Sequence, residues 1–223
     1  MHMPGSREPR THPRSPRWQR RAAARPEEVL EAALEVFGEH GFARTRLEDV
    51  ARRAGVSKGT IYLYFDSKEA LFRAMVQAKV GASVTAGEQF VRTFEGPTPQ
   101  LLQVFLQRYW AVMRQPTQAR LVRVVLAELG HFPELARFYR DEVILRVRRV
   151  LTAIIERGVA RGEFRPVSPV LVAQALQVLC VHLTQFPHDL CAAAPADTDI
   201  VAGIVDLCLH GLLAASATAP PAG

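Results

Sequence analysis

Apolar residues recur every three to four positions in nearly every segment after residue 25, and this period constrains the fold more than any other feature of the sequence. In residues 134–161, for example, Val143, Val147, Val150 and Ile154 fall on one face of a helix. The alternation of apolar and polar residues that marks a half-buried strand is absent throughout. The pattern predicts an all-α chain of about nine helices, with a small N-terminal helical unit followed by a larger C-terminal bundle.

The excess positive charge lies at the N-terminus. The net charge is +6; residues 1–25 hold seven arginines against one acid, whereas residues 26–223 hold 21 basic and 21 acidic groups. This Arg- and Pro-rich tail has almost no apolar residues, so we expect it to be disordered, and the same holds for residues 217–223. The tail can act as a basic arm along nucleic acid or as a solvated leader.

Membrane insertion and export are not expected from this sequence. The most apolar windows, residues 167–186 and 199–217, carry polar groups through their middles, which argues against a transmembrane helix. The pair Arg20 and Arg21 is not followed by an apolar run of signal-peptide length. Three cysteines are too few for a disulfide framework, and a reducing, cytoplasmic compartment is the simpler interpretation.

Residues 47–65 have the length of a helix-turn-helix and its turn signal, a glycine, Gly55, between two short helical patterns. In the second helix, Ile61 and Phe65 take the buried positions. The outward side is left to residues rich in hydrogen-bonding groups: Lys58, Gly59, Thr60, Tyr62 and Tyr64. Such a helix can enter a DNA major groove. In the alternative interpretation, the two tyrosines only cover the seam between helices.

Two capping boxes are predicted around this unit. Thr45 and Glu48 have the required spacing ahead of the first helix of the pair. Asp66 and Glu69 have it ahead of a further helix that begins near Lys68.

Residues 47–71, LEDVARRAGVSKGTIYLYFDSKEAL, closely resemble the DNA-binding signature of the TetR family of bacterial transcriptional regulators. The resemblance extends over residues 26 to about 72. It implies base-edge contacts from Lys58, Gly59 and Thr60. It also implies contacts to the DNA backbone from Tyr62, Tyr64 and Lys68, and from Thr45, which could instead cap its own helix. The family often has a small hydroxyl residue where this chain has Arg46, which can reach the same phosphate.

The resemblance and a helix-breaking, Gly- and Pro-containing segment at residues 93–99 divide the chain into domains. We expect a helix-turn-helix DNA-binding domain at 26–72, a connecting helix at 73–95, and an effector-binding and dimerisation domain at 96–216. The implied function is that of a homodimeric repressor that binds a palindromic operator in double-stranded DNA and is released by a small-molecule effector. We expect no enzymatic activity, cofactor or metal, and a dimer formed through the last two long helices.

An effector needs an apolar pocket with a few polar groups. The candidate lining residues are aromatic or polar side chains of the C-terminal part, most of which would otherwise simply pack in the core: Tyr109, Trp110, Phe132, Phe138, Tyr139, His182 and Phe186.

Three alternatives remain. A metal- or redox-sensing regulator could use Cys180, Cys191 and Cys208 with histidines of residues 180–210, although residues two apart on a helix, such as Cys180 and His182, cannot face one ion. The Gly-x-Ser-x-Gly pattern at residues 55–59 would suit a hydrolase only if a strand preceded it, and the pattern there is helical. The third alternative is a self-associating helical protein that binds DNA without sequence specificity. A measurement of sequence-specific DNA binding distinguishes it from the repressor.

Overall fold

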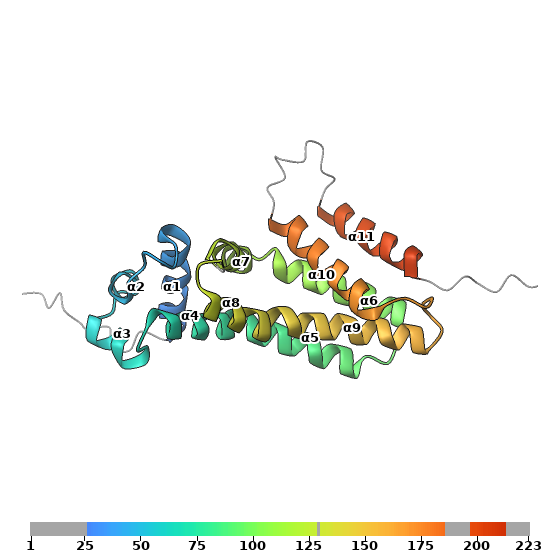
Figure 1. The fold of residues 1–223 in the computed structure, drawn as a ribbon, viewed down its shortest axis with the longest axis horizontal. Helices are drawn as coiled ribbons and strands as arrows, with labels where there is room; N and C mark the ends of the chain where they lie inside the picture. Colours follow the sequence, from blue (N-terminus) through green and yellow to red (C-terminus); the bar gives the residue numbers. More distant parts are fainter. Residues whose placement is uncertain (1–25, 129, 186–196, 213–223) are drawn as a thin grey trace, which may run out of the picture.

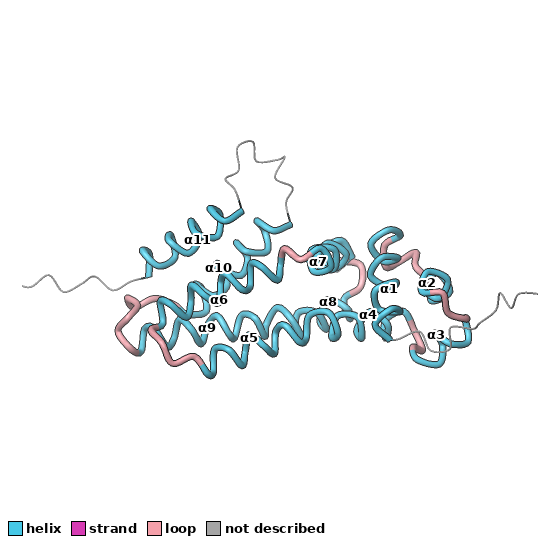
Figure 2. Tube along the Cα trace, turned by 180° about the vertical axis from the view of Figure 1, so that it is seen from behind, coloured by secondary structure: helices cyan, strands magenta, loops and turns pink. Residues whose placement is uncertain are grey.

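The computed structural model of the chain describes residues 26–128, 130–185 and 197–212. Within these ranges every regular element is a helix, which confirms the predicted all-α class (Figures 1 and 2). The expectations for residues 1–25 and 217–223, and those for Phe186 and Cys191, lie outside the described residues.

The N-terminal unit consists of α1 (Pro26–His40), α2 (Leu47–Ala54), α3 (Lys58–Tyr64) and α4 (Lys68–Val76). It is held together by an aromatic cluster, in which Phe42 packs against Phe37 and Phe72 with ring centroids 5.3 and 5.6 Å apart. These rings lie beside the fully buried Leu71 and Met75 of α4. The apolar face of α4 is therefore part of the core that supports α2 and α3.

Helix α4 does not end at the edge of this unit. A single π-helical segment, η1 (Gln77–Gly81), joins it to α5 (Ala82–Thr93), so residues 68–93 form one continuous rod. In the same way α8 (Pro133–Tyr139) passes through the π-helical segment η2 (Arg140–Ile144) into α9 (Leu145–Ala160). We call these the α4–α5 rod and the α8–α9 rod.

The C-terminal bundle adds α6 (Thr98–Met113), α7 (Pro116–Glu128), α10 (Pro169–Gln185) and α11 (Asp197–Leu212). The eleven α-helical elements of the described residues thus reduce to nine continuous helices, because each π-helical segment joins two of them. The two rods lie side by side along the length of the molecule, and α6 and α10 pack against α9 (Figures 1 and 2). The rods therefore connect the helix-turn-helix unit to the bundle.

The helix caps lie one residue away from both predictions, and only the first of them forms a capping box. The N-cap of α2 is Arg46, whose backbone N–H donates to the Asp49 carboxylate at 3.1 Å. Thr45 cannot cap this helix, because its buried hydroxyl donates to the Gly41 carbonyl at the end of α1, at 2.7 Å. The N-cap of α4 is Ser67, whose Oγ accepts from a backbone N–H in the first turn at 3.1 Å, and not Asp66.

The predicted break between residues 93 and 99 is present, since α5 ends at Thr93 and α6 begins at Thr98. No helix of the described residues is long and apolar enough to cross a membrane.

Candidate nucleic-acid interface and ligand cavity

The turn between α2 and α3 holds α3 in a defined orientation. Gly55 adopts a left-handed conformation (φ 71°) that ends α2, a conformation that favours glycine. Ser57 then caps α3 by accepting the Thr60 N–H at 3.1 Å. Ile61 is buried against the rest of the unit. The outer face of α3 is therefore fixed by a cap at its start and an apolar anchor in its middle.

The outward face of α3 carries the residue types expected there. Lys58 and Gly59 are exposed, Thr60 is half-buried, and Tyr62 and Tyr64 are 42% and 55% exposed. Because both tyrosines keep about half of their surface exposed, this structure does not favour the alternative in which they only seal a helix seam. Base and phosphate contacts by these five residues remain predictions.

Sequence reasoning missed Leu63. This side chain is 79% exposed on the same short helix, four residues after Gly59 and three after Thr60. Its neighbours in sequence gave little sign of this, because a leucine beside Ile61 suggests core packing. An exposed leucine on a helix that enters a major groove can contact the methyl group of thymine.

Glu48 of α2 ties two of the predicted contact residues together. Its carboxylate pairs with Lys58 Nζ at 2.7 Å and accepts a hydrogen bond from the Tyr62 hydroxyl at 3.1 Å. The hydrogen bond from Lys58 is the main cause that lowers the pKa of Glu48 to about 2, and the same pair raises the pKa of Lys58. Both side chains are thus oriented by α2, and the predicted base contact of Lys58 would require it to leave this carboxylate.

A shallow polar hollow at the start of α2 brings together Thr45, Arg46, Tyr62 and Lys68. Lys68 donates to the carbonyls of Phe42 and Ala43 at 3.0 and 2.9 Å, so its ammonium joins the start of α4 to the loop after α1. The Thr45 side chain is only 2% exposed, and it serves the fold rather than the surface.

Arg44 borders the same hollow and was not among the predicted residues. Neither Arg44 nor Arg46 pairs with a carboxylate of the described residues, whereas Arg52 pairs with Asp49 at 2.6 Å and Arg53 with Glu35 at 2.9 Å. Because their charges are not neutralised by those acids, the arginines of the α1–α2 loop are suited to phosphate contacts. The family resemblance points to Arg46, but nothing in the sequence pattern separates Arg44 from the paired arginines.

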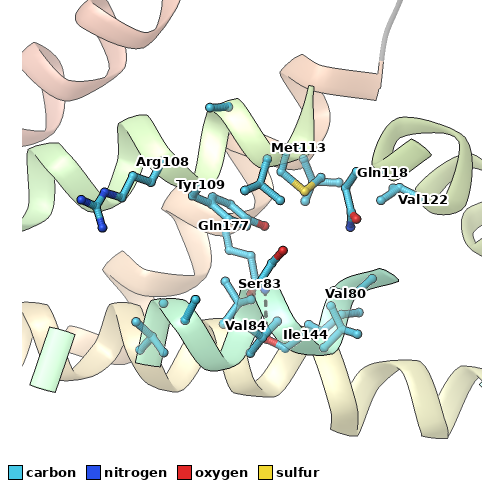
Figure 3. Close-up of a pocket in the computed structure, with 18 of the residues that line it drawn as sticks. Val80, Ser83, Val84, Arg108, Tyr109, Met113, Gln118, Val122, Ile144 and Gln177 are labelled. Atoms are coloured by element: carbon cyan, nitrogen blue, oxygen red, sulfur yellow. Dashed lines mark hydrogen bonds between the residues drawn. The ribbon is translucent and has the colours of Figure 1, made fainter. Parts of the chain in front are cut away.

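The bundle encloses a cavity of about 470 Å³ between the two rods, α6, α7 and α10 (Figure 3). Its walls are mostly aliphatic and aromatic, and its buried lining includes Val80, Val84, Val122, Val143, Val147 and Val150. Both rods thus contribute to the wall. A cavity of this size and composition fits a drug-sized apolar molecule.

Arg108 is an exposed residue of the lining, and we call the edge of the cavity at which it lies the mouth. The Arg108 guanidinium lies over the Phe90 ring, 4.1 Å from its centroid. Arg108 is the one charged side chain in the described lining, and it pairs with no carboxylate of the described residues. The mouth is therefore positively charged, whereas the interior is neutral.

Of the predicted pocket residues, Tyr109 and Tyr139 line the cavity. Trp110 is buried outside that lining, because it lies about 100° around α6 from Tyr109. Phe132 packs on Phe42 with centroids 4.8 Å apart, and Phe138 lies against the Arg73 guanidinium at 5.1 Å.

The remaining prediction concerns His182, which is exposed on α10 and does not line the cavity. The cavity lining therefore includes two of the predicted residues and does not include Trp110, Phe132, Phe138 or His182.

The described residues contain no group of three or more His, Cys, Asp or Glu that could hold a metal ion. Cys180 is buried and Cys208 half-buried, and both are free thiols. Burial raises the pKa of Cys180 to about 12 and also raises that of Cys208, so both stay protonated near neutral pH. Protonated thiols react slowly, which gives no support to a redox sensor built on these two residues.

Two family models match the chain. "Bacterial regulatory proteins, tetR family" covers residues 29–75, which include α2 and α3. "AefR-like transcriptional repressor, C-terminal domain" covers residues 100–215, which include much of the cavity wall.

Individual proteins are similar over most of the chain. The fatty acid metabolism regulator protein of Bacillus subtilis is 25% identical over 138 residues, 62% of this chain and 70% of that protein. The HTH-type transcriptional repressor KstR2 of Mycolicibacterium smegmatis is 26% identical over 147 residues, 65% and 69% of the two chains. The structure of FadR from Bacillus subtilis in complex with stearoyl-CoA superposes with a TM-score of 0.68 at 19% identity, over 84% of this chain and 99% of that one.

Proposed function

Because this chain belongs to the TetR family of bacterial transcriptional regulators, and so is a DNA-binding regulator, we propose that it acts as a homodimeric repressor released by a small amphipathic effector. One observation carries the effector part of the proposal. The rod that supports α3 at one end, α4–α5, lines the cavity at the other through Val80 and Val84.

Binding in the cavity can bias the position of the helix-turn-helix unit through this rod. A ligand that separates α5 from α9 would tilt α4, and with it α2 and α3, which pack on the same core. A second junction lies at α7, where the Glu128 carboxylate accepts the Phe42 backbone N–H at 3.1 Å. The ligand can shift the equilibrium only by its preference for the released conformer.

Dimerisation through α10 and α11 is supported by their exposed apolar side chains. Val170, Leu171 and Val178 on α10 are 56–67% exposed, and Leu207 on α11 is 69% exposed. Large exposed aliphatic residues on two adjacent helices suit an interface with a second copy, related by two-fold symmetry. Such a dimer would present two α3 helices to successive major grooves, as a palindromic operator requires.

The effector class follows from the mouth and the interior of the cavity. An apolar interior suits a hydrocarbon chain, and Arg108 at the mouth suits an anionic head group. The relative named for fatty acid metabolism and the neighbour bound to stearoyl-CoA point the same way. We therefore propose a fatty acyl compound, as an acid or a coenzyme A thioester.

The proposal has a DNA-binding half and an effector half. The DNA half is tested by selection from a random DNA duplex library, with the full-length protein and with a chain that lacks residues 1–25. We expect both proteins to enrich the same palindrome. Fatty acids and acyl-CoA compounds are then titrated against the selected duplex, and release by at least one of them is expected.

Two outcomes would contradict the proposal. If no sequence is enriched and binding disappears with the tail, only non-specific attraction between arginine and phosphate remains. If a palindrome is enriched but no acyl compound alters the affinity, the DNA half stands and the effector half fails.

A further inference from the structure

Two glutamines line the cavity in opposite hydrogen-bonding states. The Gln177 side chain is satisfied. Its Nε2 donates to the Ile144 carbonyl at 2.9 Å (Figure 3). Its Oε1 accepts from Arg148 Nε at 3.2 Å. Gln118 is 95% buried, and its amide makes no hydrogen bond with any described residue. Its polar atoms face the cavity and are not sealed inside the protein, so a ligand that fills the cavity has to offer them partners or leave them unpaired.

Two hydroxyl groups share this situation. Tyr139 is 94% buried, Tyr109 is half-buried, and neither hydroxyl has a hydrogen-bond partner among the described residues. Burial raises the pKa of Tyr139 to about 12 and raises that of Tyr109 as well, so both are neutral donors. Figure 3 shows Tyr109 and Gln118 extending from α6 and α7 into the cavity, Gln118 on the side of Val80. We call Tyr109, Gln118 and Tyr139 the polar trio.

A saturated hydrocarbon chain that filled this cavity would cover the polar trio without offering it a partner. Each buried donor or acceptor left unpaired costs free energy comparable to a lost hydrogen bond. A ligand oxygen in the same place would accept from a tyrosine hydroxyl or the Gln118 amide, and a ligand hydroxyl could also donate to the amide oxygen. The site therefore distinguishes an oxygenated chain from a plain one.

The oxygen function has to be neutral. The one charged group of the described lining, Arg108, lies at the mouth, so a carboxylate beside the polar trio would be buried without a counter-ion. We propose that the effector is an amphipathic acyl compound whose chain bears a hydroxyl or carbonyl oxygen, and that Tyr109, Gln118 and Tyr139 recognise this oxygen while Arg108 binds the anionic head. This inference rests on the proposed effector site and deepens it.

Calorimetric titration of dodecanoic acid and its monohydroxy positional isomers tests the proposal, with release of the selected duplex measured in parallel. We expect one isomer, whose hydroxyl reaches the polar trio, to bind about tenfold more tightly than the unsubstituted acid. In Gln118→Leu, and to a smaller extent in Tyr139→Phe, the ratio of the affinity for this isomer to that for the unsubstituted acid should fall toward one. The same Gln118→Leu variant should bind the unsubstituted acid more tightly than the wild type does.

Val122→Ala is the matched control, because Val122 lines the cavity but offers no hydrogen-bonding side chain. It should change the affinity for plain and hydroxylated acids by the same factor and leave their ratio unaltered. Thermal melting of each variant verifies that it is folded.

The outcomes separate this inference from the proposed function. If the plain acid binds as well as every isomer and Gln118→Leu does not tighten its binding, recognition by the polar trio is refuted while the acyl effector stands. If no acid binds at all, the effector half of the proposed function fails and this inference fails with it.

Discussion

At the scale of single residues, the outer face of α3 combines polar groups with one apolar side chain. Thr60 and Lys58 offer hydrogen bonds, and Leu63, 79% exposed, offers a methyl-bearing surface. Direct readout in the major groove uses both kinds of contact, because thymine is distinguished there by its methyl group. Leu63 therefore belongs with the candidate reading residues.

Leu63→Ala should relax the preference for one base pair in each half-site, by about 1 kcal/mol, with little change in stability, since the side chain is not in the core. Library selection with wild type and variant measures the preference, and thermal melting measures the stability. Leu63→Met, which keeps an apolar side chain, is the control. A uniform loss of affinity over all sequences would instead assign Leu63 a structural role.

The Glu48 carboxylate provides a pH test at the same scale. Its pKa is lowered to about 2, so the stabilisation that it contributes is fully present above the ordinary glutamate value of 4.5 and is lost as the pH falls toward 2. The difference in unfolding free energy between wild type and Glu48→Gln should therefore be constant from pH 7 to 5 and should shrink below pH 4.

Urea unfolding of the two proteins at several pH values measures this difference. Glu48→Gln should also bind non-operator DNA more tightly, because Lys58 then has no carboxylate to exchange. Asp141→Asn alters an exposed pair with Arg140 far from α3, and it is the control for the DNA-binding measurement. A difference that persists unchanged at pH 3 would contradict the assigned pKa.

At the scale of helices, the end of α9 depends on a glycine. A Cβ built on Gly158 would lie 2.1 Å from the buried Phe164 ring, and the Phe164 backbone N–H donates to the Gly158 carbonyl at 3.0 Å. The glycine thus lets the chain after α9 turn back closely onto the helix.

Gly158→Ala should lower the free energy of unfolding by about 1–3 kcal/mol. Overpacking against Phe164 outweighs the gain of up to about 1 kcal/mol that alanine brings to a helix. Denaturant unfolding measures the change. Gly81→Ala in the η1 segment, where no described atom lies within 4 Å of the added Cβ, is the control and should not destabilise. Equal effects of the two substitutions would rule out the steric explanation.

The contact between α7 and the α1–α2 loop is a second feature at the scale of helices. Glu128 accepts the Phe42 N–H, and it approaches so closely that a Cβ on Gly41 (φ 76°) would lie 2.7 Å from its Oε1. This bond links the wall of the cavity, to which α7 contributes Val122, to the helix-turn-helix unit.

Glu128→Ala should leave the affinity for the acyl effector unchanged but weaken effector-induced release of DNA, by roughly 0.5–2 kcal/mol in coupling free energy. Titrations of effector with and without operator measure this coupling. Glu128→Gln keeps an acceptor oxygen and should retain most of the coupling free energy. If Glu128→Ala shows full coupling, the signal passes through the α4–α5 rod alone.

At the scale of the whole molecule, the proposed dimer would bind its operator through the spacing of its two α3 helices. Leu207→Glu places a charge on the exposed apolar surface of α11. It should shift the protein toward monomer in sedimentation experiments and reduce operator affinity at least about tenfold, since one half-site then binds alone. Gln103→Glu adds the same charge at an exposed position of α6 and should remain dimeric. A dimeric Leu207→Glu protein would exclude this surface as the interface.

The sequence by itself determined the all-α class, the order of the helices and, except for Leu63, the outward face of α3. These follow from local physics: the 3.6-residue apolar period, the glycine after α2, and Ile61 as the inward anchor all act within a few residues. The caps were predicted only to within one residue, because Thr45 turned inward to a carbonyl of α1, a contact that spacing alone does not reveal.

Only the tertiary structure decided which side chains face the cavity. Tyr109 and Trp110 are adjacent aromatics on α6, and the packing of α5, α7 and α9 around that helix placed the first in the cavity wall and the second outside it. Gln118 attracted no attention in the sequence, since its importance lies in the partners that it lacks. Hydrogen-bond satisfaction depends on every neighbouring helix at once, and a linear pattern carries no record of those neighbours.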